Sequence, residues 1–584
     1  MDDRIARLES ATEQLLAAVR VLQQRVDALE ARPVSPALVA DGAREGTGSQ
    51  ASSRSLATRH PYDPIVVVSL VGRLFLVLAG GFFLRAMTEA GVLPVPVGIT
   101  LAFAYALIWL GLGDRAGGRG QSSSAIFHAL AAAMVAFPLV VEATTRFKVM
   151  GVAGSAVVLA ALSVAFLFVA WRQRLQAVAW VAVLAALPTS LVLLAKTGVI
   201  APFALYLIAL GVATLWLGYT LEWTWLRWPT ALVADAVVAG MALQALSPEH
   251  RDSFRVALLM QLTLLAAYLV SIAIRTLVRS RRVIPFEVVQ TAIALVVGFG
   301  GALYLTRATG AVPAALGLVS LVLGAACYAV AFAFVDRHED LERNAYFYTT
   351  LALVLVISGL ALELQTQWLG VVFAVLGVLA AVFWCRHGRL YMLLHAAVYA
   401  VAAGAASHAL GYGTSALAVS PVGPWVSPGA VMFLVLLASL LTAWFAAVRP
   451  SPAGGAPASV LRLSIAIVIV WIIGGCLTGG IAPVVAGGTD DSVDVGALAT
   501  VRTCVLAAIT LLAAWVGRHP RFREWAWLVY PLLVLIGLKM VVQDFKFSRP
   551  ATLFIALALY GVALIVAPRL RKGAGPAVAE PAGG

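Results

Sequence analysis

Residues 176–219 read QAVAWVAVLAALPTSLVLLAKTGVIAPFALYLIALGVATLWLGY, and this stretch decides the fold. Two apolar runs, 176–195 and 200–219, flank a short segment that ends in TGVIAP. Each run has the length, about 20 residues, that an α-helix needs to cross the roughly 30 Å hydrocarbon core of a bilayer. Backbone N–H and C=O groups in lipid must be satisfied within their own segment, so each run is predicted to be a transmembrane helix.

Apolar runs of similar length follow one another from residue 65 almost to the end of the chain. Hydrophobic residues make up 61% of the 584 residues and charged residues 12%, about half the charged share of soluble proteins. This pattern predicts an all-α, polytopic transmembrane helix bundle of about eighteen spans. The predicted spans are 65–84, 95–112, 125–141, 151–171, 176–195, 200–219, 229–246, 254–274, 285–305, 313–335, 345–363, 367–385, 389–409, 428–447, 460–480, 496–516, 525–543 and 550–567.

The net charge of +13 does not indicate a nucleic-acid-binding protein, because the basic residues lie in short loops between apolar runs. They gather in every second loop, and two such loops carry Arg275, Arg279, Arg281 and Arg282, and Arg518, Arg521 and Arg523. Loops rich in Lys and Arg stay on the cytoplasmic side of a membrane. We therefore expect a multi-pass protein of the bacterial inner (cytoplasmic) membrane, with both termini in the cytoplasm.

The TGVIAP segment recurs as TEAGVLP, TGAVP and TGGIAP, each after one apolar run and before the next. Glycine can end a helix in the left-handed conformation, and proline suits the first turn of the following helix. The four segments are therefore predicted to be exterior turns between antiparallel spans. The nearly equal spacing of the first three indicates an internal four-helix repeat, with independent convergence on a Gly-Pro turn as the alternative. The turn glycines are Gly91, Gly198, Gly310 and Gly479.

The first 32 residues have a different pattern, in which apolar residues alternate at spacings of three and four. β-Branched residues at the a positions and Leu at the d positions favour a parallel two-stranded coiled coil. We expect a cytoplasmic coiled coil that forms a homodimer; a single amphipathic helix lying on the membrane is the alternative. The core positions are Ile5, Leu8, Thr12, Leu15, Val19, Leu22, Val26 and Leu29.

Three further segments complete the predicted organisation. Residues 33–64 are rich in Pro, Ser, Gly and Ala without a period, which predicts a flexible linker. Residues 65–568 form the transmembrane domain, and residues 569–584 a disordered cytoplasmic tail.

Four stretches of the chain resemble a family of bacterial predicted membrane proteins known as domain of unknown function 2339. They are VGRLFLVLAGGFFLRAMTEAGVLP (71–94), LPTSLVLLAKTGVIAP (187–202), LELQTQWLGVVFAVLGVLAAVFW (362–384) and GLKMVVQDFKFSRPATLFIALALYGVALIVAP (537–568). The resemblance covers essentially the whole chain. It implies a multi-pass protein of the inner membrane and supplies no catalytic residue.

Four ionisable residues lie inside predicted spans, where the cost of a charge makes each a functional hypothesis. They are Arg73, Asp235, Arg502 and Lys539. Asp235 is the strongest candidate because it is the only carboxylate well inside a span. Its functional interpretation is a proton or cation relay, or a counter-charge for a bound substrate. The alternative is a buried ion pair with Arg73 or Arg502 that orients helices. Lys539 is expected to extend outward toward the membrane surface over about one turn.

Other polar residues are predicted to be solvated, to pack in the core or to cap helices. Glu142, Glu287 and Glu363 lie at span ends, where solvent reaches them, and His128 and His395 are single histidines expected to be hydrogen-bonded packing residues. Asp490, Asp491 and Asp494 form DDxxD, a pattern that binds Mg²⁺-diphosphate in prenyl-chain enzymes. Its position in a Gly-rich loop before a span favours helix N-capping instead.

No catalytic, metal or cofactor site is predicted. The four cysteines lie singly in different spans without CxxC spacing, which indicates neither a zinc site nor a disulfide framework. The predicted function is non-enzymatic: the bundle moves or shelters a small or lipid-like substrate within the bilayer. The alternatives are an assembly scaffold that uses the coiled coil, and an integral-membrane glycosyl or lipid transferase. The cysteines are Cys327, Cys385, Cys476 and Cys504.

Overall fold

The computed structural model of the chain describes residues 64–245, 253–308, 310, 314–335, 342–418, 427–449, 456–487 and 494–572. The chain divides into two units, Met1–Val68 and Ser69–Gly584, and only the last residues of the first unit are described. The predicted coiled coil, the linker before residue 64 and the tail after residue 572 lie outside the described residues, as do the side chains of residues 64–73.

The described residues form helices joined by short turns and contain no strand. The first half consists of α2 (Pro64–Glu89), α3 (Val95–Gly118), α4 (Ser122–Thr145), α5 (Val152–Gln173), α6 (Gln176–Thr197), α7 (Ala201–Leu221), α8 (Arg227–Gln244), α9 (Phe254–Ala273), η1 (Ile274–Val278), α10 (Pro285–Ala294), η2 (Leu295–Gly300) and α11 (Gly301–Ala308). The second half consists of α12 (Ala314–Val330), η3 (Ala331–Val335), α13 (Glu342–Glu363), α14 (Thr366–His387), α15 (Leu390–Ala406), α16 (Ala409–Ala418), α17 (Ala430–Val448), α18 (Ala456–Val485), α19 (Val495–Val516), η5 (Pro520–Leu528), α20 (Val529–Lys539), η6 (Met540–Asp544), α21 (Phe545–Phe547) and α22 (Pro550–Lys572).

A helix occupies each of the eighteen predicted positions, and the all-α membrane fold is confirmed. By length and composition, fifteen described helical segments can cross a bilayer, or sixteen if the bent pair α15 and α16 is one span. With the bent pair counted as one span, two of the eighteen predicted positions are left outside this count. The helices not among them are α2, whose first side chains are not described, and α8, which carries Arg227 and Asp235. With 18 residues, α8 is about 27 Å long, close to the thickness of the hydrocarbon core.

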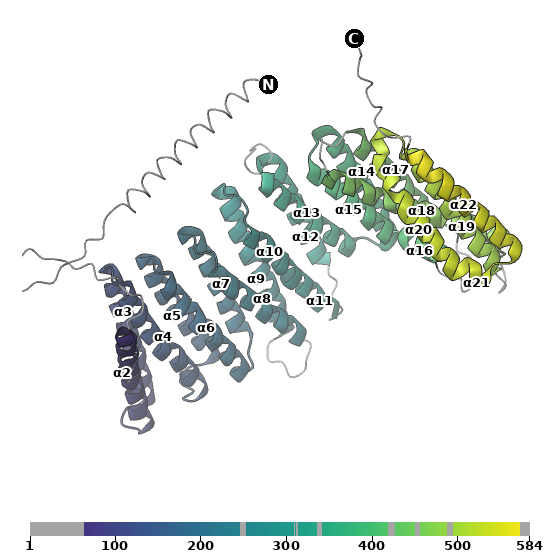
Figure 1. Cartoon of the computed structure of the whole chain (residues 1–584). Helices are drawn as coiled ribbons and strands as arrows, with labels where there is room; N and C mark the ends of the chain where they lie inside the picture. The colour runs from purple at the N-terminus through teal and green to yellow at the C-terminus, as the bar shows by residue number, and fades with distance from the viewer. Residues whose placement is uncertain are drawn as a thin grey trace, which may run out of the picture. The chain divides into compact units, whose positions relative to one another are not determined.

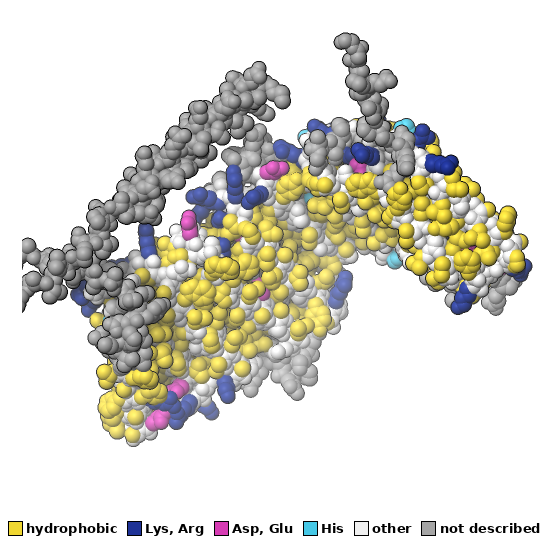
Figure 2. Space-filling view, in the orientation of Figure 1, with side chains coloured by type: hydrophobic (Ala, Val, Ile, Leu, Met, Phe, Trp, Pro, Cys, Tyr) yellow, Lys and Arg dark blue, Asp and Glu magenta, His cyan; other side chains and the backbone are white. Residues whose placement is uncertain are grey.

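From α3 to α11, consecutive helices pack against one another and lie side by side in chain order (Figure 1). One apolar core joins α3 to α11, and a second joins η3 to α20. On the face seen in Figure 2, hydrophobic side chains form a broad flank between two borders where the charged side chains lie. Lys and Arg are most frequent along the upper border of that view. An apolar flank between charged borders is the surface that a bilayer requires.

Three of the four predicted turn glycines have a left-handed backbone. The φ values of Gly91, Gly198 and Gly310 are 73°, 68° and 69°. A residue with a Cβ is strained in this region, so glycine is the natural choice there. Gly198 is the C-cap of α6, and its N–H donates to the carbonyl of Leu194. The segment quoted first is thus a helix stop followed by a helix start.

The prediction of a turn at Gly479 is wrong. Gly479 lies inside α18, which continues through Pro483 and ends at Val485. The side chain of Tyr412 from α16 packs directly on Gly479 and leaves no room for a Cβ there. This glycine therefore permits close approach of two helices, and the left-handed turn occurs later, at Gly487, where φ is 74°.

The thirteenth predicted span is also different, because it breaks after α15. The chain bends by 66° and continues as α16, of which residues 410–418 lie beyond the predicted span. His408, at the bend, has a φ of 58°. Because of this break, α16 packs against α18. The carbonyl oxygen of Ala416, near the end of α16, accepts a hydrogen bond from Arg502 of α19.

Candidate functional site

Asp235 lies at the midpoint of α8 and is 3% exposed. Its carboxylate accepts hydrogen bonds of 3.0 and 2.9 Å from Nε2 of Gln290 on α10. Gln290 is itself buried and is the only hydrogen-bond or ion-pair partner of Asp235 among the described residues. An ionised carboxylate in an apolar interior needs a compensating proton, cation or set of hydrogen bonds. One amide group provides little of that compensation.

The predicted ion pair between Asp235 and Arg502 is wrong, because the two residues lie in different clusters. Arg502 on α19 donates from Nε to the carbonyl oxygen of Ala416, at 2.7 Å. The pairing of Asp235 with Arg73 stays a prediction, since the Arg73 side chain lies outside the described residues.

Three buried polar atoms near Asp235 have no hydrogen-bond partner in the part of the chain that the structure describes. They are Oε1 of Gln261, the hydroxyl oxygen of Tyr268 and Oε1 of Gln290. Gln261 and Tyr268 have no exposed surface, and Tyr268 is within electrostatic range of Asp235. Gln261 is tied to the helix of Asp235 by a 2.7 Å hydrogen bond from Nε2 to the carbonyl of Val238. Buried polar groups are nearly always satisfied, so such a group of exceptions indicates a site for water, an ion or a ligand.

Glycines bring the neighbouring helices close around these side chains. The Tyr268 hydroxyl packs against Gly211 of α7, where a Cβ would collide with it. A Cβ at Gly301 of α11 would lie 2.6 Å from Oε1 of Gln261. The backbone at both positions thus lies directly against these polar side chains, as small residues allow at close contacts between membrane helices.

A second charged cluster lies toward one end of the same helices. Glu287 is fully buried and accepts hydrogen bonds from Arg275 at 2.8 and 2.9 Å, from Tyr219 at 2.7 Å and from the backbone N–H of Ile284 at 2.8 Å. The Arg275 guanidinium also lies over the Tyr219 ring, 4.6 Å from its centroid. The interpretation of Glu287 as an ordinary solvated residue is therefore wrong. It precedes Gln290 by one turn, so one face of α10 carries both side chains.

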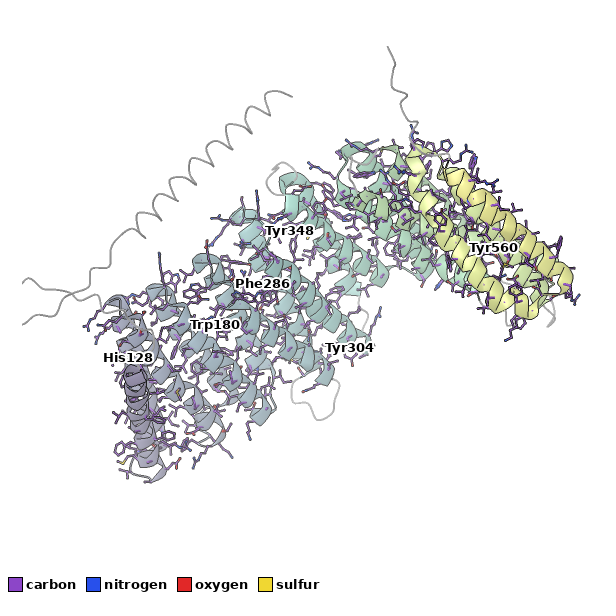
Figure 3. All side chains as sticks on the ribbon, viewed as in Figure 1. His128, Trp180, Phe286, Tyr304, Tyr348 and Tyr560 are labelled. Atoms are coloured by element: carbon purple, nitrogen blue, oxygen red, sulfur yellow. The ribbon has the colours of Figure 1, made fainter. Side chains whose placement is uncertain are left out.

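Arg227, the first residue of α8, lies at the same end of the site as Glu287 and Arg275. Its guanidinium lies 4.8 Å from the centroid of the Phe286 ring, and its Nε has no hydrogen-bond partner among the described residues. Phe286 is the second residue of α10, and Tyr304, labelled toward the lower edge in Figure 3, lies in α11 at the other end of the same span. The charged end of the site is thus the end where α10 begins.

Segments of π-helix coincide with the buried polar residues. Arg275 lies in η1, and η2 packs on α9, which carries Gln261. Asp544 in the second half lies in η6. Wide turns of this kind are rare and occur often at functional sites, because they shift side chains out of the regular helical register.

The C-terminal half contains the other buried charges. Lys539 is 8% exposed and donates to Asp544 at 2.7 Å, to Thr503 at 2.6 Å and to the carbonyl of Ala499. The predicted outward extension of Lys539 is therefore wrong. This cluster is satisfied by its own members and joins α19 to α20 and η6, so we interpret it as structural.

The remaining candidates have local roles. Asp494 is the N-cap of α19 and accepts hydrogen bonds from the N–H groups of Gly496 and Ala497, while Asp490 and Asp491 lie outside the described residues. Glu142 pairs with Arg85 at 2.6 Å. His128 and His395 each make one side-chain hydrogen bond, to Ser124 and to Tyr328.

Comparison with known proteins gives one finding about the family. Residues 66–579 match the model of a family described as predicted membrane protein, the domain of unknown function 2339. No curated protein matches, and no solved structure matches.

Proposed function

The chain belongs to this family of predicted membrane proteins, and from that premise we propose that it is a non-enzymatic protein that moves a small substrate through its helix bundle. Asp235 is the central residue of the proposal. It binds a proton and releases it in exchange for a small cation or a cationic solute.

The environment of Asp235 carries this proposal. The carboxylate lies at the middle of a helix of bilayer length, is 3% exposed and has, among the described residues, one neutral hydrogen-bond partner. Ionisable residues at such a depth are expensive and commonly mark ion or proton pathways. Within the part of the chain that the structure describes, oxygens of Gln261, Tyr268 and Gln290 have no hydrogen-bond partner, and oxygen is the ligand atom that small hard cations prefer.

A line of polar side chains leads from Asp235 to the end of the bundle where α10 begins. Gln290 contacts Asp235, and Glu287 lies one turn away from Gln290 on the same helix. Glu287 contacts Arg275, whose Nη1 also donates to the backbone carbonyl of Arg282. The two carboxylates on this route, Asp235 and Glu287, are of the residue type that passes protons between the membrane centre and one surface.

The sidedness and the assembly of the protein belong to the proposal as well. We infer a bacterial inner-membrane location with cytoplasmic termini from the distribution of arginines in alternate loops. A homodimer through residues 1–32 follows from their heptad pattern. An anchor for a scaffold needs only one or two spans, which favours transport over the scaffold alternative.

An exchange assay in vesicles tests the proposed function. The full-length protein is reconstituted in vesicles with an acidic lumen, and a pH-sensitive dye reports the loss of the pH difference when Na⁺, K⁺, Li⁺ or a small organic ammonium is added. We expect at least one of these cations to collapse the pH difference faster than in protein-free vesicles. Identical rates with and without protein for every cation would contradict the proposal.

A further inference from the structure

A cavity of about 500 Å³ lies between α10 and α13, on the side of α10 that faces away from Asp235. Two contacts tie α13 to the segment that precedes α10: Tyr348 with Thr276 of η1 at 2.6 Å, and Asn344 with the N–H of Val283 at 2.8 Å. The volume lies within the range of ligand sites in proteins.

The walls of the cavity are apolar and open toward the bilayer. Val288 lines it from α10, Leu295 from η2, and Phe347 and Val354 from α13. Val288 is 50% exposed and Val354 44% exposed, so the cavity opens sideways on the surface that lipid covers. A hydrocarbon chain can enter from the membrane without crossing water.

One wall carries a buried hydroxyl that points to a ligand. Thr291 lines the cavity, is 4% exposed, and its Oγ1 has no hydrogen-bond partner among the described residues. Thr276 and Thr349 nearby each donate to the carbonyl four residues earlier, which is the usual arrangement of a buried helical threonine. Thr291 does not, so its hydroxyl is available to an acceptor in the cavity.

The positive charge at the cavity favours a lipid with an anionic headgroup. Arg343 is the only charged residue among those that line the cavity, and it lies in the first turn of α13. The turn that leads to Val283 and Ile284 adds Arg279, Arg281 and Arg282. An arginine at the membrane surface binds phosphate through paired N–H groups.

We propose that the cavity between α10 and α13 binds an anionic phospholipid of the surrounding leaflet. Its phosphate lies at Arg343, one acyl chain fills the space between the helices, and an ester carbonyl accepts from Thr291. Thr291 lies about 10 Å below the start of α10, a depth that suits the ester level when the phosphate is at the helix end. This site is separate from Asp235 and does not depend on the proposed exchange.

Native mass spectrometry of the full-length protein tests the site. The protein is released from nanodiscs that contain equal amounts of phosphatidylglycerol and phosphatidylethanolamine. We expect retained phosphatidylglycerol on the wild type. Ala292→Leu adds three carbons to the cavity wall. Each displaced methylene changes affinity about fourfold, so retention should fall about tenfold or more. Arg343→Gln should lower the preference for phosphatidylglycerol about fivefold.

Two matched variants control for surface changes. Ala325→Leu alters an exposed alanine of α12 outside the cavity, and Arg386→Gln removes an exposed arginine at the end of α14. Both should retain lipid as the wild type does. The proposal is overturned if the wild type retains no lipid, if Ala292→Leu retains as much as Ala325→Leu, or if phosphatidylethanolamine is preferred. If added free phosphate abolishes retention of the lipid, the site binds a soluble anion instead, and the proposal is also overturned.

Discussion

Asparagine in place of Asp235 is expected to slow cation-driven proton exchange by about 100-fold or more, the contribution typical of a positioned proton-transfer group. Asparagine has the same shape and cannot bind a proton or carry a charge. The amide of Gln290 can still donate to the remaining carbonyl oxygen, so folding should change little, by about 1 kcal/mol or less. The rate is measured in the vesicle assay, and the folded state by thermal unfolding and expression level.

Asp114→Asn provides the matched control. Asp114 pairs with Arg172 and Gln173 at the end of α3, at 2.8 and 2.6 Å, and its side chain is 22% exposed. Loss of this carboxylate should leave exchange unchanged. If Asp235→Asn exchanges as fast as Asp114→Asn, Asp235 is not the exchanging group. If it fails to accumulate in the membrane, its role is structural.

Alanine in place of Arg275 is expected to destabilise the protein by about 3–5 kcal/mol, the range found when one member of a buried ion pair is removed. Glu287 has no exposed surface, and Arg275 is its only charged hydrogen-bond partner among the described residues. The substitution would leave a buried carboxylate with a phenol and one backbone N–H. Reversible unfolding in mild detergent measures the loss.

Two further variants test whether burial of the Arg275–Glu287 pair causes the loss of stability. Arg172→Ala breaks an ion pair whose arginine is 58% exposed, and it should cost no more than about 1 kcal/mol. The double substitution Arg275→Met with Glu287→Leu removes both charges and should recover most of the stability lost in Arg275→Ala. Equal losses in Arg275→Ala and Arg172→Ala would contradict the buried pair.

The helices could be predicted from the sequence because runs of about 20 apolar residues and Gly-Pro turns are local signals. Gly198 and Pro202 mark their turn correctly, since the left-handed backbone and the helix start depend on those residues themselves. Gly479 carries the same signal in TGGIAP, yet it serves contact with Tyr412, which is distant in sequence. A glycine that permits packing and a glycine that permits a turn look alike without their neighbours.

The candidate site was predictable only in part. Asp235 could be singled out because a carboxylate within an apolar run is rare. Its actual neighbours, Gln290 and Tyr268, are uncharged residues on other helices, and no local spacing connects them. Glu287 was misjudged for a related reason: its place at a span end indicates solvent, but Tyr219 and Arg275 from two other segments enclose it.

Infrared difference spectroscopy of wild-type protein against Asp235→Asn tests the central claim most directly. A protonated carboxyl group has a C=O stretch that an ionised one lacks, and the difference between the two proteins isolates Asp235. We expect a band that is present at acidic pH and disappears when the cation active in the vesicle assay is added. Spectra of the two proteins that match in the carboxyl region at every pH would show that Asp235 binds no exchangeable proton, and they would contradict the account.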